Sequence, residues 1–244
     1  MDRGIWITWY DLPDITDANR NDFLAWLHGD YIPRVLARPG VLWAAHYAAE
    51  PQPLYSGKQG RLTRTDDPAV PQGTQFMLLF GGDEPHAFVN PAPAQFHDGL
   101  PAECKRLLGL RRGVRTNLMV EQARVIGPEA PRFPALSPCI QLGSFNSASI
   151  HDEDELADWY AQWYLASCAH VPGCVRARKL VSVSGWAKHA VLFEFESLEA
   201  RNRNFVNHEA GHPDRAAWTD KVVRRLIHAP GSPSVARRIW PVVG

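Results

Sequence analysis

An internal repeat constrains the fold of this chain more than any other feature of its sequence. Residues 23–41 and 156–174 both read as a helix that ends at a Pro-Gly pair and leads into a strand. An offset of 133 residues aligns the two segments without a gap, and it matches two aromatic pairs, Trp26 with Trp159 and Tyr31 with Tyr164. Several matches in the same order indicate two copies of one structural unit.

Each copy predicts the order strand, helix, strand, strand, helix, strand. Apolar residues at helical spacing mark the first helix, and Pro-Gly ends it because proline cannot continue a helix. The predicted strands are 5–10, 41–47, 76–80 and 115–126 in the first copy and 138–143, 175–183, 190–195 and 234–243 in the second. The second helices are predicted at 102–110 and 216–228. This order is that of the ferredoxin-like unit, in which two helices cover one face of a four-stranded sheet.

Shorter matches and proline-rich segments place the boundaries of the two copies. The tripeptide at 88–90 recurs at 205–207, an offset of only 117, so the first copy holds extra residues. Segment 50–75, with four prolines and three glycines, reads as the inserted loop. Segment 127–138, with four prolines, reads as a linker between a first unit at 1–126 and a second at 139–244.

The predicted strands carry apolar residues on both faces. Trp6 and Tyr10, for example, alternate with Ile5, Ile7 and Trp9. A single unit would leave one of these faces exposed to water, which a soluble protein rarely tolerates. We therefore expect an α+β fold in which two tandem ferredoxin-like (βαββαβ) units pack sheet to sheet as a pseudo-dimeric α+β barrel. The ligand cavity is expected inside that barrel.

A family resemblance rests on three local patterns. They are an F-x-x-W helix start at Phe23, a proline two residues after Tyr31, and Pro39-Gly40-Val41 before an aromatic-rich strand. On these residues the chain resembles the dimeric α+β barrel superfamily, and within it the EthD-like proteins. The resemblance implies a relative of cofactor-free mono-oxygenases, isomerases, polyketide cyclases or haem-dependent enzymes. EthD-like members often carry a histidine where this chain has Tyr31 and, in the second copy, Tyr164.

Histidine and tyrosine side chains are the candidates for catalysis. His46 lies in an aromatic strand, and it is a candidate general base if it faces the cavity rather than the helices. His28, one helical turn before Tyr31, could assist it. Tyr31 and Tyr164 recur at equivalent positions and could bind a phenolic or carbonyl oxygen, although both could equally pack in the core.

Four further side chains are candidates for ligand binding. Trp9 and Trp43 are expected to line an aromatic cavity. Arg176 and Arg178 alternate along a strand that should be half buried. There they would suit a carboxylate-bearing ligand through charge-assisted hydrogen bonds, or they would lie at an edge exposed to water.

The segment from His208 to His212 reads His-Glu-Ala-Gly-His and matches the H-E-x-x-H pattern of zinc peptidases. The context opposes a zinc site. Gly211 weakens a helix, and Pro213 disfavours the α conformation at His212. We therefore expect a solvated helix end at these residues, with no metal bound by His208, Glu209 and His212.

Composition narrows the classes of partner. Basic and acidic side chains number 26 each, so a net charge of zero gives no electrostatic basis for binding nucleic acid or an anionic membrane. The four cysteines are scattered, and we expect buried, reduced thiols in a cytoplasmic protein. The expected partner is a small-molecule ligand, bound by a monomer with an internal pseudo-dimer or by a homodimer of it.

Three functions remain open from the sequence. The first is a cofactor-independent enzyme that acts on a small apolar or aromatic, polyketide-like compound by general acid–base chemistry, as a mono-oxygenase, isomerase, cyclase or lyase. The second is a non-catalytic small-molecule binding protein, which the missing family histidine favours. The third is a haem- or metal-dependent enzyme, with His170 or His189 as conceivable ligands.

Overall fold

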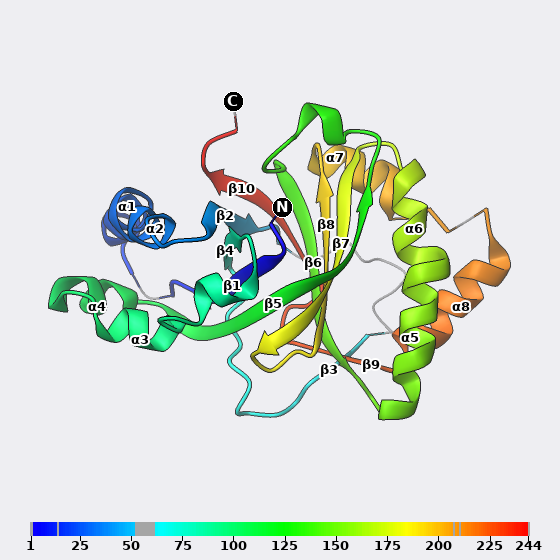
Figure 1. Ribbon diagram of the computed structural model, residues 1–244, viewed down its shortest axis with the longest axis horizontal. Helices are drawn as coiled ribbons and strands as arrows, with labels where there is room; N and C mark the ends of the chain where they lie inside the picture. Colours follow the sequence, from blue (N-terminus) through cyan, green and yellow to red (C-terminus); the bar gives the residue numbers. More distant parts are fainter. Residues whose placement is uncertain (1, 14, 52–61, 207, 210, 244) are drawn as a thin grey trace.

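An eight-stranded antiparallel barrel forms the centre of the molecule (Figure 1). The computed structural model describes residues 2–13, 15–51, 62–206, 208–209 and 211–243. The barrel strands are β1 (Gly4–Asp11), β2 (Val41–Ala49), β4 (Phe76–Gly82), β5 (Arg112–Ile126), β6 (Cys139–Ser147), β7 (Cys174–Ser184), β8 (His189–Phe195) and β10 (Ser234–Trp240). Two short strands, β3 (Thr63–Arg64) and β9 (Leu226–His228), pair with each other, and β9 also pairs with β6.

The strand order is the same in the two halves of the chain. Around the barrel it is β2-β4-β1-β5 in the first half and then β7-β8-β6-β10 in the second. Within each half the first strand lies between the third and fourth strands of that half, and the second strand lies at one edge. Pairing of β5 with β7 and of β2 with β10 joins the halves and closes the barrel. The expected α+β barrel is therefore confirmed.

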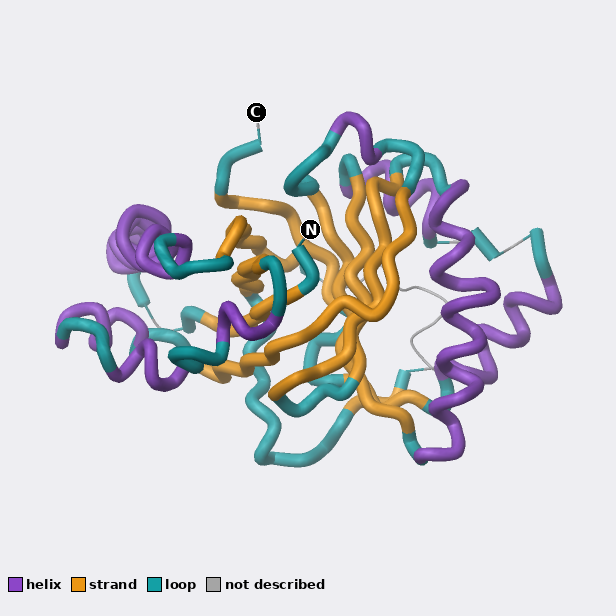
Figure 2. The backbone as a smooth tube through the Cα atoms, viewed as in Figure 1, coloured by secondary structure: helices purple, strands orange, loops and turns teal. Residues whose placement is uncertain are grey.

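Helices cover the outside of the barrel, in one group on each side (Figure 2). The first group holds α1 (Asp17–Trp26), the π-helical turn η1 (Leu27–Tyr31), α2 (Ile32–Leu36), the 3₁₀ turn η3 (Pro85–Phe88), α3 (Pro93–Asp98) and α4 (Ala102–Leu108). The second holds α5 (Glu153–Trp159), the π-helical turn η6 (Tyr160–Tyr164), α6 (Leu165–Ser167), α7 (Leu198–Ala200), η8 (Arg201–Phe205) and α8 (Pro213–Val223). Further 3₁₀ turns are η4 (Ala130–Arg132), η5 (Ile150–Asp152) and η7 (Cys168–His170).

Local geometry repeats at the offset that the sequence predicts. The π-helical turns Leu27–Tyr31 and Tyr160–Tyr164 lie 133 residues apart. The glycines of the two Pro-Gly pairs, Gly40 and Gly173, both adopt a left-handed backbone, with φ of 79° and 84°. Glycine suits this conformation because it has no Cβ, so each Pro-Gly pair turns the chain sharply from helix to strand.

Alternation along the strands sorts side chains into three cores. On β1, Trp6 and Tyr10 pack beneath the first group of helices, whereas Ile5, Ile7 and Trp9 point into the barrel. A third cluster fills the space beneath the second group of helices. The cluster inside the barrel is buried, and Ile5, Ile7 and Trp9 are at most 1% exposed. A ligand cavity in the middle of the barrel stays a prediction.

Several predicted element ends differ from the structure. The helix predicted at 216–228 ends at Val223, and Leu226–His228 forms strand β9 because its backbone pairs with the end of β6. The last strand ends at Trp240, before Pro241, which has no backbone N–H to donate. Of the predicted inserted loop, residues 52–61 lie outside the described residues.

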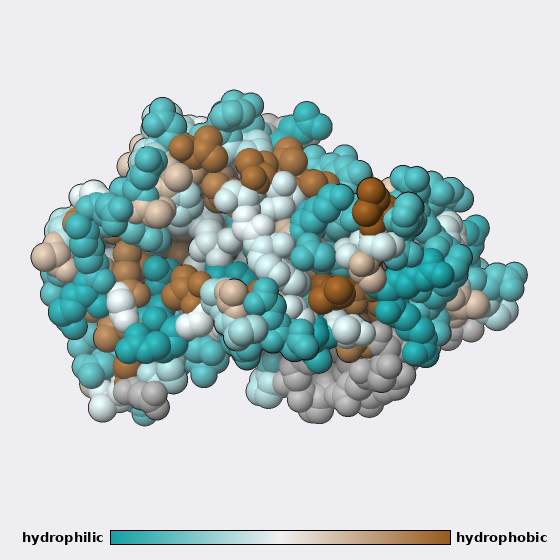
Figure 3. Space-filling view, turned by 90° about the horizontal axis from the view of Figure 1, so that it is seen from below, coloured by the Kyte–Doolittle hydropathy of each residue, from teal (hydrophilic) through white to brown (hydrophobic). Residues whose placement is uncertain are grey.

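The surface of the described residues is mainly hydrophilic in the view of Figure 3. In the view of Figure 3, hydrophobic side chains gather in separate groups among hydrophilic ones. No helix within the described ranges has the length and apolar character needed to cross a bilayer. All four cysteines are buried free thiols, as expected.

Candidate functional site

A cavity lies between the sheet of the second half and its helices. Its volume is about 90 Å³, several times the roughly 10–15 Å³ that one water needs. Strands β6, β8 and β9, the turns η6 and η8, and helix α8 line it. Six aromatic side chains line it: Phe145, Trp159, Tyr160, Tyr164, Phe193 and Phe205. Its polar groups are Gln141, Arg201, Thr219 and His228.

The absence of a side chain on Gly143 explains why the cavity lies in this half. Gly143 lines the cavity, and its place in β6 corresponds at the offset of 133 to Tyr10 in β1. The ring of Tyr10 fills the equivalent space in the first half, where it is fully buried and stacks on Phe76 with 5.4 Å between ring centroids. The two halves therefore share a fold but not a cavity.

Tyr160 lines this cavity, and its side chain is 4% exposed. Burial raises the pKa of the phenol well above its usual value, so it stays protonated at neutral pH. Its ring lies parallel to that of Phe145, with 6.5 Å between centroids.

His228 also lines this cavity. Its Nδ1 atom is buried and has no hydrogen-bond partner in the described part of the chain. Burial lowers the pKa of the imidazole to about 4, although backbone groups of Thr63 and Leu226 that hydrogen-bond the ring act in the opposite direction, so the ring is neutral at pH 7. The centroid of His228 lies 5.5 Å from that of Phe145, so Tyr160 and His228 lie near the same phenylalanine ring.

Amide groups hold the charged side chain of the cavity. Arg201 is 1% exposed. Its Nε donates to Oε1 of Gln141 at 3.0 Å and its Nη1 donates to Oδ1 of Asn202 at 2.7 Å. Nε1 of Trp159 donates to Oγ1 of Thr219 at 3.1 Å. These contacts fix polar groups in an otherwise largely apolar site.

Only one of the two predicted tyrosines lines the cavity. Tyr164 does so, and its ring stacks on Trp159 with 4.2 Å between centroids. Tyr31 is buried in the first half, where its hydroxyl forms a hydrogen bond with Nε2 of His97 at 2.8 Å. Burial also raises the pKa of Tyr31 to about 12.

The two predicted histidines come together, but beneath the helices of the first half. Trp43, Ala45 and Tyr47 point into the barrel, so His46 faces the other way. The hydroxyl of Tyr10 lies 2.8 Å from Nε2 of His46, and Nδ1 of His46 lies 2.9 Å from Nε2 of His28. Burial, together with the neighbouring His28, holds the pKa of His46 well below its usual range. These contacts form a chain from a buried phenol to the half-buried His28.

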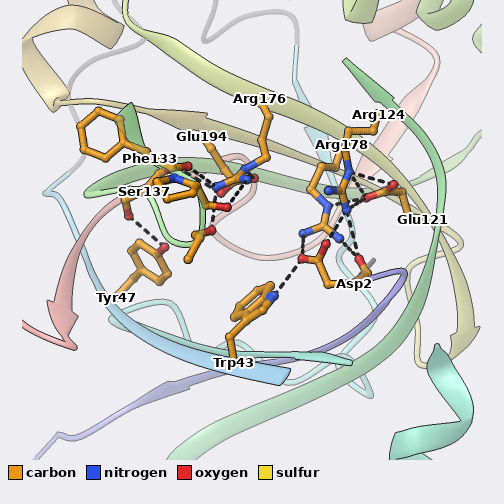
Figure 4. A network of polar contacts seen from close by, with 12 residues as sticks. Asp2, Trp43, Tyr47, Glu121, Arg124, Phe133, Ser137, Arg176, Arg178 and Glu194 are labelled. Atoms are coloured by element: carbon orange, nitrogen blue, oxygen red, sulfur yellow. Dashed lines mark hydrogen bonds and ion pairs between the residues drawn. The ribbon is translucent and has the colours of Figure 1, made fainter. Parts of the chain in front are cut away.

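The two predicted arginines lie inside the barrel and are occupied by the protein itself (Figure 4). Nε of Arg176 lies 2.8 Å from Oε2 of Glu194, and its Nη2 donates to the carbonyl of Ala135 at 2.6 Å. Nε of Arg178 donates to Oε2 of Glu121 at 2.6 Å. Both guanidinium groups therefore hold strands, linker and N-terminal segment together rather than facing a ligand.

The two predicted tryptophans also serve the barrel interior. Trp9 belongs to the apolar cluster and lies beneath the guanidinium of Arg115, 4.3 Å from its ring centroid. Nε1 of Trp43 donates to Oδ2 of Asp2 at 2.8 Å (Figure 4). Neither residue lines the cavity of the second half.

The H-E-x-x-H segment lies before α8, as predicted. His208 stacks on Phe205 with 4.8 Å between centroids, and its Nδ1 lies 2.7 Å from the carbonyl of that residue. Glu209 is 4% exposed, so the expected solvated helix end is wrong for this carboxylate. Among the described residues, no group of three or more His, Cys, Asp and Glu side chains is placed to hold a metal ion.

The two histidines considered as haem or metal ligands, His170 and His189, differ in their surroundings. Both ring nitrogens of His189 are engaged, Nε2 with Glu153 at 2.8 Å and Nδ1 with Nζ of Lys179 at 2.9 Å. His170 is exposed. His228 has an open nitrogen, but the cavity of about 90 Å³ beside it has room for a small ring system rather than for a porphyrin.

Sequence reasoning missed most polar groups of the cavity. Gln141 is a polar residue inside a strand that is otherwise apolar, which was a usable signal. His228 was assigned to the end of a helix, and Arg201 had no pattern around it. These side chains meet only because β6, η8 and β9 pack around the same space.

Comparison with known proteins bears on the fold. No family model matches the chain, and no curated protein matches it. A suspected monooxygenase from Fusobacterium nucleatum has a similar structure, with a TM-score of 0.56 and 10% identity over 98% of this chain and 93% of that one. An anthrone oxidase-like protein has a TM-score of 0.55 and 11% identity, covering 98% of this chain and 92% of that one. A dye-decolorizing peroxidase from Bacteroides thetaiotaomicron has a TM-score of 0.55 and 9% identity, covering 98% of this chain and 93% of that one. At these identities the likeness shows the fold alone.

Proposed function

We propose that this chain is an enzyme that binds a small aromatic or apolar compound in the cavity of the second half and acts on it by general acid–base chemistry without a resident cofactor. One observation carries the proposal. A protonated phenol, Tyr160, and a neutral imidazole, His228, line the same cavity, and Nδ1 of His228 is buried without a hydrogen-bond partner among the described residues. Buried polar groups normally have partners, so this nitrogen suits a ligand that supplies one.

The chemistry follows from the protonation states. The hydroxyl of Tyr160 donates a hydrogen bond to a carbonyl or phenolate oxygen of the compound. Nδ1 of His228 accepts a proton from a carbon or hydroxyl group next to that oxygen, which leaves an enolate or phenolate and an imidazolium. Because burial disfavours the imidazolium, the step depends on the negative charge that forms beside it and on the donor that stabilises this charge. Such a step can begin an isomerisation, a cyclisation or a reaction with dioxygen.

The substrate class is proposed from the cavity wall and from the names of similar structures. Six aromatic side chains in a cavity of about 90 Å³ favour a flat, conjugated compound with a small ring system. The similarity to an anthrone oxidase-like protein and to a suspected monooxygenase, although it shows only the fold, agrees with such a substrate. Tyr164 belongs to this wall and is proposed to position the ring system. Catalysis by His46, His28 and Tyr31 stays a prediction, since they lie outside this cavity.

The chain as a whole is proposed to be an EthD-like tandem protein of the cytoplasm. Its ferredoxin-like units would be residues 1–126 and 139–244, joined by the linker 127–138. The pairings of β5 with β7 and of β2 with β10 close the barrel within one chain. A monomer can therefore form the whole barrel, and we propose that it is the functional unit.

A non-catalytic binding protein is the second candidate. The low pKa of His228, about 4, makes it a weak base and favours a role in binding alone. Tyrosine in place of the family histidine points the same way. The two candidates share the cavity and differ only in proton transfer.

The experiment separates binding from proton transfer. A panel of small enolisable aromatic ketones and phenols is titrated into the protein by calorimetry, and exchange of the acidic C–H with deuterated water is followed by NMR for each compound that binds. We expect the wild type to accelerate exchange, and His228→Asn to lower that rate about 100-fold or more while binding persists. His151→Asn, an exposed histidine, is the matched control.

The outcomes distinguish the candidates. Tyr160→Phe should weaken binding and exchange together, because its hydroxyl serves both. Binding without accelerated exchange would establish the binding protein instead. Failure of every compound to bind, or binding that survives unchanged in both Tyr160→Phe and His228→Asn, would refute the cavity as the site.

A further inference from the structure

Three arginines inside the barrel are each less than 9% exposed, and one of them differs from the other two. Arg176 has Glu194 as an ion-pair partner, and Arg178 has Glu121 and Asp2 (Figure 4). Arg115 is 3% exposed, yet no carboxylate in the described part of the chain lies within ion-pair distance of it.

The hydrogen-bonding groups of Arg115 are all open. Its Nε, Nη1 and Nη2 atoms are buried, and none has a hydrogen-bond partner among the described residues. Its guanidinium group lies over the ring of Trp9, with the guanidinium carbon 4.3 Å from the ring centroid. Trp9 is its direct cross-strand neighbour, and Trp9 belongs to the apolar cluster inside the barrel. One face of the guanidinium is thus covered while its N–H edges are unused.

This arrangement is unfavourable for a protein on its own. Burial of a charged group without a partner costs several kcal/mol, and a cation–π contact offsets only about 2 kcal/mol of that cost. Burial accordingly lowers the pKa of Arg115 to about 10, with no neighbouring charge to counter the effect. A guanidinium nevertheless remains charged at neutral pH. The barrel therefore contains a buried positive charge that lacks a counter-charge.

Arg115 lies too far from Asp2 to share this carboxylate with Arg178. Asp2 and Arg115 lie near opposite ends of the barrel, because Arg115 pairs with Trp9 and Asp2 precedes Gly4 at the other end of β1. Seven residues of extended strand span roughly 20 Å. At that distance the attraction between two charges is small compared with the cost of burial.

Other unused polar atoms occur in the same region. Asn117, two residues along β5 and on the same face, donates its amide to the carbonyl of Ala187 at 3.1 Å, while its Oδ1 atom is buried and has no described partner. Oγ of Ser144, on β6, is buried and also has none. Arg115 supplies charge, and Oδ1 of Asn117 on the same face of β5 supplies a hydrogen-bond acceptor.

We propose that Arg115 anchors a second binding site, at this end of the barrel, for a small molecule that carries one carboxylate. A planar carboxylate matches two parallel N–H groups of a guanidinium, and Trp9 leaves that edge free. The apolar surroundings favour a monoanion over a dianion such as phosphate, because the cost of desolvation rises steeply with charge. Since the nitrogens are enclosed, binding requires local opening of this end of the barrel. The site does not include the cavity of the proposed function.

The test measures unfolding temperature against anion. Acetate, propionate and benzoate are titrated at constant ionic strength against chloride and phosphate, with the full chain. A carboxylate at 100 times its dissociation constant should raise the Tm of the wild type by about 5–10 °C, with saturation. Arg115→Met should abolish the carboxylate-dependent rise. Without carboxylate, Arg115→Met should have a higher Tm than the wild type, since it removes an unpaired buried charge.

Controls make every outcome decisive. Arg106→Met, at an exposed arginine paired with Glu103, should keep the full carboxylate effect. Arg115→Lys, which keeps the charge without the parallel N–H pair, should keep less than half of it and serves if Arg115→Met does not fold. A wild-type Tm that is independent of carboxylate, an equal rise with chloride or phosphate, or a rise retained in Arg115→Met would each overturn the proposal.

Discussion

His46 and Lys179 occupy matching positions in the two halves of the chain, each six residues after a glycine with a left-handed backbone. Both side chains are buried beneath helices, and each forms a hydrogen bond with a histidine: His46 with His28 at 2.9 Å and Lys179 with His189 at 2.9 Å. The same place in the fold thus holds a polar, titratable group in each half. The group is an imidazole at His46 and an amine at Lys179, so the two sites should respond differently to pH.

The pH dependence of stability should reveal Lys179. Burial lowers its pKa to about 7, from an ordinary value of 10.5. Between these two pH values the unfolded chain holds a proton that the folded chain lacks, so stability rises with pH by at most about 1.4 kcal/mol per pH unit. We expect the free energy of unfolding, measured with urea, to be larger at pH 9.5 than at pH 7.5. In Lys179→Met this rise should largely disappear.

Lys105→Met is the control for that experiment, because Lys105 is exposed on α4. It should keep the rise of the wild type. A rise that persists unchanged in Lys179→Met would mean that Lys179 stays protonated at pH 7.5 and above. Lys179 would then be a buried ammonium group that donates a hydrogen bond to Nδ1 of His189.

The chain of hydrogen bonds around His46 should be important for stability. In His46→Phe, the hydroxyl of Tyr10 loses its acceptor and His28 loses its partner, and both groups remain at least partly buried. Leaving buried polar groups unsatisfied costs about 1–3 kcal/mol each, so we expect a loss of about 2–4 kcal/mol in unfolding free energy. His46→Gln should lose less, because glutamine can both donate and accept. His86→Phe, at an exposed histidine, should change stability by less than about 0.5 kcal/mol.

Filling the cavity should block ligands without unfolding the protein. In Gly143→Leu the new side chain enters the space that Tyr10 occupies in the other half, and its Cβ would lie 3.3 Å from Cγ1 of Val191. We expect binding of any compound found in the panel to fall at least 10-fold. The free energy of unfolding should change by less than about 1.5 kcal/mol, since filling offsets the close contact.

The matched control is Gly29→Leu, because a Cβ at Gly29 meets no atom within 4 Å. It should leave ligand affinity unchanged. If Gly143→Leu bound its compound as tightly as the wild type, that compound would have to occupy another part of the molecule. The correspondence between Gly143 and Tyr10 would then have no bearing on the site.

The repeat could be predicted from sequence because its signals are local. Pro-Gly pairs and the aromatic positions Trp26 and Trp159 recur within one helix and one turn, where spacing alone determines which side chains share a face. The faces of the strands could not be assigned in this way. Apolar residues lie on both sides of β2, and only contact with Tyr10 and His28 shows that His46 lies beneath helices.

The cavity was harder to predict for a physical reason. It exists because a side chain is absent at Gly143, and its polar groups come from segments that are up to 87 residues apart, Gln141 and His228. No spacing rule relates such positions. The ion pairs of Arg176 and Arg178 could not be predicted for a similar reason, since their partners Glu194, Glu121 and Asp2 are distant in sequence.

Acid should destabilise the protein at a higher pH than the carboxylates alone would require. Burial lowers the pKa values of His97, His189 and His228 to about 4 each, from an ordinary 6.5. As pH falls from 6.5 to 4 the unfolded chain takes up protons at these sites before the folded chain does, so stability present above pH 6.5 is lost. Urea unfolding at pH 7, 6 and 5 should show this loss, and His228→Asn should reduce its slope by up to about 1.4 kcal/mol per pH unit. The exposed control His151→Asn should leave the slope unchanged. Equal stability of the wild type at pH 7 and pH 5 would show that these imidazoles take up protons in the folded chain as they do in the unfolded chain, so burial would not lower their pKa values.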